Sequence, residues 1–510
     1  MEVKEMNRWF SEKIKLITDP YFDREFFTNL IFCLDRKKTL REIFEESLVD
    51  FNSSPNFSEE FDKSLFQLLV GYQSSQFLRE SYQILPLAQA LYAAALYRSE
   101  GRSPIVRKNI ESAKARGSSL DEFEKMLSFE AREVTDFQRV WSSLLFLLQS
   151  RSNRTEAVKL VLNSAARHTD RLSFRYLVKS FEICFSSSWE DAEIFLQRPF
   201  ERFWNKSKAL PKDGVLRNAE ALVLGCPTQL EPGRGMTWPK EWSEELWYRV
   251  SKQTGESAWE HIDLMSKQGA SLDQVEVAVQ LMFARCLFFM KPHQWSLVAD
   301  SMLYAEALRS MGRWSPESRK QNLAACVLEL SFLTNLICRE EPSRPTGASV
   351  VEKFSQNLGK NQLILRLDDA IETSDSEKAF DLAAVILKDR GLSHSLCDRL
   401  LLMASKQDAW SYSMMTLPIA YSLANSFEVA VRLQLSQDLL EDAAFGLTNL
   451  FLQEREFSLA QVKKQGNYGD GGLKISNFDV SGGARIVDRF VFNQLRNAQR
   501  IFIWPTEGKG

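Results

Sequence analysis

Two segments of the chain carry basic residues at matching positions, and the type and spacing of these residues suit them to bind an anion. In each segment two arginines flank a glycine and two more cations follow a Ser-Pro pair, which is typical of the start of a helix. Backbone N–H groups at a helix N-terminus and nearby guanidinium groups together favour phosphate or carboxylate. The candidate anion-binding residues are Arg98, Arg102, Arg107 and Lys108 in the first segment, and Arg309, Arg313, Arg319 and Lys320 in the second. The alternative is a solvated helix hairpin whose cations stabilise helix carbonyls and dipoles.

A second group of arginines lies near the end of the chain. On a helical wheel for residues 484–502, four arginines fall within about 60° of one another, and apolar residues occupy the opposite side. A glycine-rich stretch precedes this predicted basic amphipathic helix. We expect the helix either to pack on the body of the protein or to bind a protein partner or an anionic membrane surface. The candidate partner-binding residues are Arg485, Arg489, Arg496, Arg500, Phe490, Leu495 and Phe502.

Residue types that support metal or nucleophilic chemistry are not grouped in the sequence. The four histidines are far apart, and there is no CxxC pair, so the common metal-binding spacings are absent. The sequence also lacks a GxSxG elbow, a Walker-type loop and a GxGxxG motif that follows a strand. We therefore predict no metal site and no cofactor, and the catalytic residues of any enzyme activity are unknown.

Four tryptophans gather in one part of the chain, at Trp238, Trp242, Trp247 and Trp259. Tryptophans at this spacing line a pocket for a flat ligand or a peptide in some proteins. More often they are large buried residues that consolidate a junction between packed elements. We expect the second arrangement.

The first cationic segment belongs to a longer internal repeat. Residues 82–102 align without gaps on residues 293–313, and seven of the 21 positions are identical. Both copies end in Arg-Ser-x-Gly-Arg, and Ser-Pro follows directly in the first copy and after the extra residue Trp314 in the second. This pattern predicts a helix, a tight corner with a left-handed glycine at Gly101 or Gly312, and a second helix that is capped by Ser103 or Ser315. Internal repetition of helical pairs is the signature of a helical array.

Apolar residues recur at intervals of three and four along most of the chain, which predicts an all-α fold. The segment 274–290 is apolar nearly all round, so we expect it to be central. With 35 phenylalanines against 22 glycines and 15 prolines, the composition favours long packed helices over a turn-rich β fold. The predicted helices cover residues 61–70, 84–98, 136–149, 156–166, 174–184, 274–290, 294–310, 319–338, 377–388, 395–405 and 430–454.

Prolines and glycines divide this predicted array into parts. They are dense between residues 211 and 241, which separates the two copies of the repeat, and glycines are frequent again between 462 and 483. The predicted organisation is an N-terminal helical half (1–210), a loop (211–241), a C-terminal helical half (242–461), a Gly-rich linker (462–483) and a basic amphipathic helix with its tail (484–510). We expect two duplicated halves that form a helical array or superhelical bundle.

Composition limits the compartment and the partners. The net charge is −3, so the chain as a whole does not attract nucleic acid or membranes, and we consider nucleic-acid binding unlikely. Seven scattered cysteines are typical of buried thiols in a reducing compartment. No run of 18 uncharged apolar residues is present, and the N-terminal residues lack an apolar signal stretch. These features predict a cytoplasmic protein without a transmembrane segment.

Three functions are compatible with this sequence. The first is a cytoplasmic helical-repeat scaffold or adaptor that binds a protein partner and has no catalytic activity. The alternative is a helical enzyme, for example an oxidase, with a metal, haem or flavin at the junction of the two halves. The second alternative is binding of anions or nucleic acid through the repeated arginine-rich corners.

Overall fold

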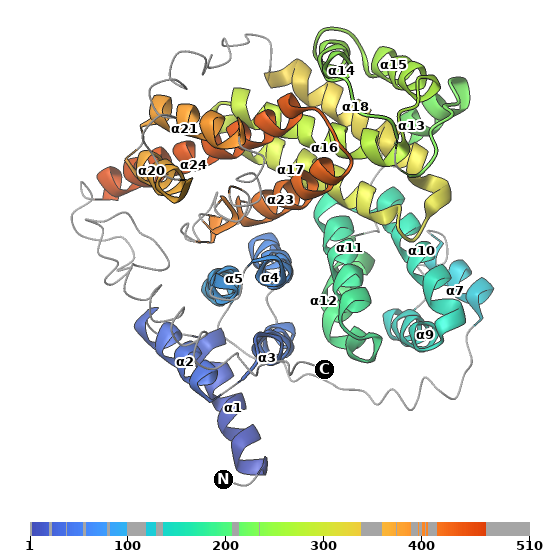
Figure 1. Cartoon of the computed structure of the whole chain (residues 1–510). Helices are drawn as coiled ribbons and strands as arrows, with labels where there is room; N and C mark the ends of the chain where they lie inside the picture. Colours follow the sequence, from blue (N-terminus) through green and yellow to red (C-terminus); the bar gives the residue numbers. More distant parts are fainter. Residues whose placement is uncertain are drawn as a thin grey trace, which may run out of the picture.

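The computed structural model describes residues 3–19, 23–36, 38–54, 58–78, 82–98, 119–128, 136–206, 214–233, 235–337, 360–373, 375–388, 396, 400–402, 404–405 and 416–465. In this part of the chain every regular element is a helix, and no strand is present (Figure 1). The helices pack side by side into an array around a continuous apolar core. The predicted all-α fold is therefore confirmed.

The N-terminal half, residues 3–206, begins with a group of helices around the buried helix α5. Helix α4 packs along α5, and α1 and α3 cover other sides of it, so Leu87 and Leu91 are fully buried. The helices of this half are α1 (Val3–Thr18), α2 (Asp23–Asp35), α3 (Leu40–Asn52), α4 (Glu59–Phe77), α5 (Ile84–Tyr97), α7 (Leu120–Leu127), α9 (Phe137–Gln149), α10 (Arg151–His168), α11 (Arg171–Ser186), η2 (Trp189–Asp191) and α12 (Ala192–Lys206).

The C-terminal half, residues 214–465, is arranged around α16. This helix contacts α17, α18, α23 and α24, which confirms that the segment predicted to be apolar nearly all round is central (Figure 1). The helices of this half are α13 (Gly214–Gly225), α14 (Lys240–Lys252), α15 (Gly255–Lys267), α16 (Leu272–Phe289), η3 (Pro292–Gln294), α17 (Trp295–Met311), η4 (Pro316–Ser318), α18 (Arg319–Ile337), α20 (Lys360–Glu372), α21 (Ser376–Lys388), α23 (Thr416–Arg432) and α24 (Gln437–Gln465).

Side-chain caps determine where several of these helices begin. At α3, Thr39 and Glu42 form a reciprocal capping box, and Ser271 and Gln274 form another at α16. The carboxylate of Asp170 accepts a hydrogen bond from the backbone N–H of Ser173 and so caps α11. These local hydrogen bonds fix the first turns of helices that lie in the centre of the molecule.

The repeated segments fall on helices with matching boundaries. When the sequence is shifted by 211 residues, α4 and α5 coincide closely with α16 and α17, and Leu91 and Met302 are both fully buried. The surroundings of the two pairs differ, because α4 packs mainly on α5, whereas α16 packs mainly on α24. The duplication of a packed helical unit therefore stays a prediction.

The corner after α17 differs from the predicted one. Gly312 has φ −59°, which is a right-handed helical conformation rather than the predicted left-handed one. A Cβ at this position would lie 2.6 Å from Cγ of Arg319, so the glycine serves close packing of the following helix. The Ser315 hydroxyl donates to Glu317 and makes no cap hydrogen bond, although Pro316 does occupy the start of η4 as predicted. The equivalent corner at Gly101 and Ser103 lies outside the described residues.

Two predicted boundaries are wrong in the described residues. The expected loop at 211–241 contains helix α13, because Leu216 and Ala219 are buried against α18 and this burial outweighs the flanking glycines. The expected continuous helix at 430–454 is interrupted between α23 and α24. There Gln434 adopts a left-handed φ of 57°, a conformation that glycine or asparagine normally signals.

The expected buried thiols and the expected C-terminal helix involve residues that the structure describes only in part. The described cysteines are free, and burial raises the pKa of the Cys33 thiol to about 12, in keeping with the expected buried thiols. The C-terminal amphipathic helix and most of the Gly-rich linker, residues 466–510, lie outside the described residues.

Among the described helices, none combines the length and the apolar character needed to cross a membrane.

The contact between α16 and α24 provides a test of this packing. A Cβ on Gly446 would lie 2.1 Å from the carbonyl oxygen of Ala284, so the two backbones touch without an intervening side chain. We predict that Gly446→Ala lowers the free energy of unfolding by about 1–3 kcal/mol, because the helices must separate to admit the methyl group. Denaturant unfolding of the full chain measures this change.

Gly225→Ala is the matched control, because a Cβ at Gly225 would meet no atom within 4 Å. In a helix this substitution should leave stability unchanged or raise it slightly. Equal stability of the Gly446→Ala protein and the wild type would show that α16 and α24 do not approach as described.

Candidate functional site

A cavity of about 560 Å³ lies where the two halves of the protein meet. Its walls come from α4, α10, α11 and η2 of the N-terminal half and from α23 and the corner after α17 in the C-terminal half. Helix α10 lines it with Arg151, Arg154, Thr155 and Val158, which recur at the spacing of one helix face. The cavity is therefore built from residues that are distant in sequence.

A buried ammonium group forms the floor of the cavity. Lys179 of α11 is 4% exposed and its Nζ lies 3.0 Å from an oxygen of Glu182 and 2.7 Å from an oxygen of Glu306 on α17. The same Nζ lies 5.2 Å from the ring centre of Tyr421 on α23, in a cation–π arrangement. One side chain thus connects three helices from both halves.

The charges on this floor are fixed at neutral pH. Burial alone would raise the pKa of Glu182, but Lys179 and Arg313 outweigh it and lower the pKa to about 2. Burial alone would lower the pKa of Lys179, but Glu182 and Glu306 hold it above its usual value. Burial raises the pKa of Tyr421 to about 12. These groups provide a constant electrostatic environment rather than proton transfer near neutrality.

Gln73 of α4 lines the cavity and contacts the ion pair on α11. Its Nε2 donates a hydrogen bond to Glu182 at 3.3 Å. Its Oε1 is buried, with almost no accessible surface, and has no hydrogen-bond partner among the described residues. The amide group therefore connects α4 to Glu182 of α11.

Three arginines stand around the cavity. Arg313 is 65% exposed and lies 3.7 Å from Glu182, beyond hydrogen-bond distance, so its N–H groups remain available. The Arg154 guanidinium lies 4.9 Å from the ring centre of Trp189, and its Nε donates to the carbonyl of Leu148. Arg151 is exposed at the start of α10. Neither Arg151 nor Arg154 has an ion-pair partner within the described ranges.

Further ion pairs hold α11 against the C-terminal half beside the cavity. Arg171 makes two hydrogen bonds to Glu329 of α18, at 2.6 and 2.9 Å, and Arg175 donates to Asp300 of α17 at 2.9 Å. With Lys179, these residues recur every four positions along α11. The face of α11 that meets the other half therefore carries three cations, each paired with a carboxylate of another helix.

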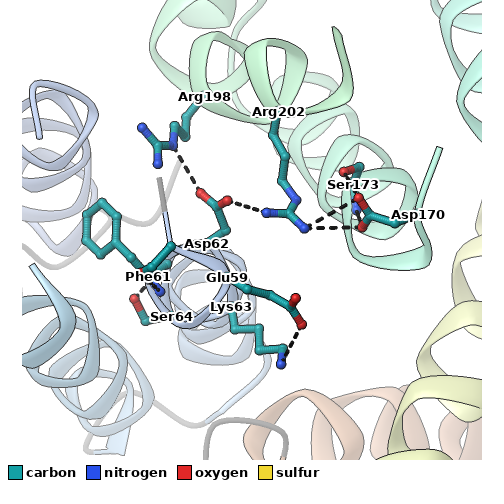
Figure 2. Close-up of polar contacts among 10 residues, drawn as sticks. Glu59, Phe61, Asp62, Lys63, Ser64, Asp170, Ser173, Arg198 and Arg202 are labelled. Carbon is teal, nitrogen blue, oxygen red and sulfur yellow. Dashed lines mark hydrogen bonds and ion pairs between the residues drawn. The ribbon is translucent and has the colours of Figure 1, made fainter. Parts of the chain in front are cut away.

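A separate buried network holds α4, α11 and α12 together within the N-terminal half. Figure 2 shows Asp62 of α4 between Arg198 and Arg202 of α12, with Arg202 also reaching Asp170, the capping residue of α11. Because α4 and α11 both line the cavity, this network fixes the relative position of two of its walls.

The structure places the described residues of the predicted anion-binding corners in different surroundings. Arg313 lines the cavity, whereas Arg98 is buried in an ion pair with Asp50. Arg309 donates to Ser426 at 3.0 Å, and burial lowers its pKa. Of the remaining pair, Arg319 donates to Glu276 and Lys320 donates to the carbonyl of Thr228.

The remaining predicted site residues are not described. Arg102, Arg107 and Lys108 of the first corner, and all the candidates on the C-terminal helix, lie outside the described residues. The described part of each corner thus shows cations that are already paired, with Arg313 as the residue that faces a cavity.

The tryptophan cluster and the histidine beside it belong to the core. The four tryptophans are at most 7% exposed, and the indole N–H of Trp259 donates to the carbonyl of Cys226. Burial, together with the nearby Arg249, lowers the pKa of His261, so its imidazole is neutral at pH 7.

Within the described residues, no group of three or more His, Cys, Asp or Glu side chains is placed to hold a metal ion.

Lys179, Glu182 and Gln73 were not among the site residues predicted from the sequence. A signal was present, because Arg175, Lys179 and Glu182 recur at intervals of four and three within a helix whose other residues are mostly apolar. A charged stripe on a helix of this kind indicates burial against charged partners rather than a solvated face. The partners themselves, such as Glu306, are more than a hundred residues away.

The depressed pKa of Glu182 predicts a pH-dependent contribution to stability. Its folded pKa, about 2, lies below its ordinary value of 4.5, so the contribution is complete above pH 4.5 and is lost as the pH falls toward 2. We predict that Glu182→Gln is less stable than the wild type by about 2 kcal/mol at pH 7. The difference should shrink steadily between pH 4.5 and 2.

Denaturant unfolding at a series of pH values measures this difference. Glu12→Gln, at an exposed surface pair, is the control and should show no such narrowing. If the gap between Glu182→Gln and the wild type stayed constant from pH 7 to 2, the carboxylate would not be ionised and paired as described.

No known family model, curated protein or solved structure matches this chain. The cavity and its charges are therefore the features that bear on function.

Proposed function

We propose that this chain is a helical-array binding protein without catalytic activity, and that a protein partner inserts an anionic group into the cavity between the two halves. The observation that carries the proposal is that Arg151, Arg154 and Arg313 line one cavity, whose lining also includes Glu182, which is already paired with Lys179. Cations from separate elements around one cavity favour an anion over a neutral ligand.

One exposed side chain in the cavity lining supports a macromolecular partner. Phe185 lines the cavity and is 74% exposed, so a large apolar side chain stands in solvent beside the arginines. An apolar residue next to a charged pocket suits a partner that continues beyond the pocket and covers the surrounding surface. A partner that covers the surface around the cavity also agrees with the scaffold or adaptor function expected from the helical array.

The enzyme alternative would use the same junction between the halves. Its support is weaker, because Glu182, Lys179 and Tyr421 keep one protonation state across the neutral range. Nucleic-acid binding through the repeated corners is also less favoured, because Arg98, Arg309 and Arg319 are engaged by protein groups.

Binding to peptide pools tests the proposal. Two fluorescent pools with random flanking residues, one with a central Glu and one with a central Gln, are titrated with the full chain at low salt. The Glu pool should bind more tightly, and Arg313→Gln should weaken its binding about tenfold, as expected for loss of a hydrogen bond to a charged group.

Arg217→Gln is the matched control, because Arg217 is exposed on α13 and does not line the cavity. It should leave binding unchanged. Equal affinity for the two pools, or equal effects of Arg313→Gln and Arg217→Gln, would overturn the proposal.

A further inference from the structure

We infer that the anionic group taken up by the cavity is a phosphate monoester carried by a phosphorylated side chain of the partner. The inference rests on the proposed function and specifies its ligand. It is drawn from three properties of the same cavity, which are its charge balance, the origin of its donors and the exposed Phe185 in its lining.

The charge balance of the cavity fits a dianion. Four cations and one carboxylate, Glu182, line it, and Glu306 pairs with Lys179 from outside the lining. The excess of at least two positive charges is more than one carboxylate ligand would neutralise. A phosphate monoester carries about −1.5 to −2 at pH 7, so it compensates more of this excess than a carboxylate does. The four cations are Arg151, Arg154, Lys179 and Arg313.

The donors come from two separate parts of the fold. Arg151 and Arg154 lie on the first turn of α10, and Arg313 follows α17. Phosphate presents three terminal oxygens to donors in different directions, whereas a carboxylate presents two in one plane.

The exposed Phe185 favours a phosphorylated peptide over free phosphate. Phe185 lines the cavity and is 74% exposed, so a partner that continues beyond the phosphate can cover this apolar side chain. Free phosphate has no apolar part to place there.

Between pH 7.5 and 5.5, the phosphate group of the ligand should be the group that changes its charge. The second pKa of a phosphate monoester is about 6, so the ligand loses close to one charge between pH 7.5 and 5.5. Glu182, with a pKa of about 2, and Tyr421, with a pKa of about 12, do not titrate in this range. The other charged groups that face the cavity are Arg151, Arg154, Lys179 and Arg313.

The experiment compares four fluorescent peptide pools with identical random flanks and a central phosphoserine, phosphotyrosine, Glu or Gln. At pH 7.5 we expect at least one phosphorylated pool to bind the full chain about tenfold or more tightly than the Glu pool. This advantage should shrink at pH 5.5. Arg151→Gln and Arg313→Gln should each reduce it, and Arg217→Gln should not. Inorganic phosphate should compete only at far higher concentration than the peptide.

The outcomes separate this inference from the proposed function. If the Glu pool bound as tightly as both phosphorylated pools, the inference would fail while the proposed function stood. If no pool bound more tightly than the Gln pool, both would fail. If inorganic phosphate competed at the same concentration as the phosphorylated peptides, the site would serve small phosphate compounds, and the peptide ligand would be refuted.

Discussion

The buried ammonium of Lys179 is the interaction on which the rest of this structure depends. It lies between Glu182 on its own helix and Glu306 on α17, so α11 of the N-terminal half and α17 of the C-terminal half are held at one distance. A buried charge without partners would cost several kcal/mol, and hence the two helices cannot separate without exposing or neutralising all three groups. The contact holds one wall of the cavity, α11, against α17, and the corner that follows α17 contributes Arg313 and Trp314 to the lining.

Other ion pairs extend the same principle across the interface. Arg171 with Glu329 and Arg175 with Asp300 continue the contact along α11, and the Asp62 network secures α4 and α12 behind it. Apolar surfaces of helices can slide past one another with little change in burial, whereas paired charges define one register. The charges therefore specify how the halves meet, while the apolar core supplies most of the stability.

The sequence predicted the fold class well and the site poorly, for physical reasons. Helical periodicity is local, so α16 and α17 were evident from their own residues. Burial against another helix is not local, and for this reason α13 was taken for a loop, and the left-handed Gln434 gave no warning of the break before α24. The site depends on pairs such as Lys179 with Glu306, 127 positions apart, which no local pattern reveals. Of the predicted corner residues, the structure places Arg313 at the cavity.

A double-mutant cycle between Lys179 and Glu306 tests the central claim most directly. Unfolding free energies are measured for the wild type, Lys179→Met, Glu306→Gln and the double variant. The account predicts a coupling energy of about 2 kcal/mol or more, because removal of Lys179 costs less once one of its buried carboxylates is gone. Additive effects within about 0.5 kcal/mol would mean that the two side chains do not meet, and would contradict the described junction of the two halves.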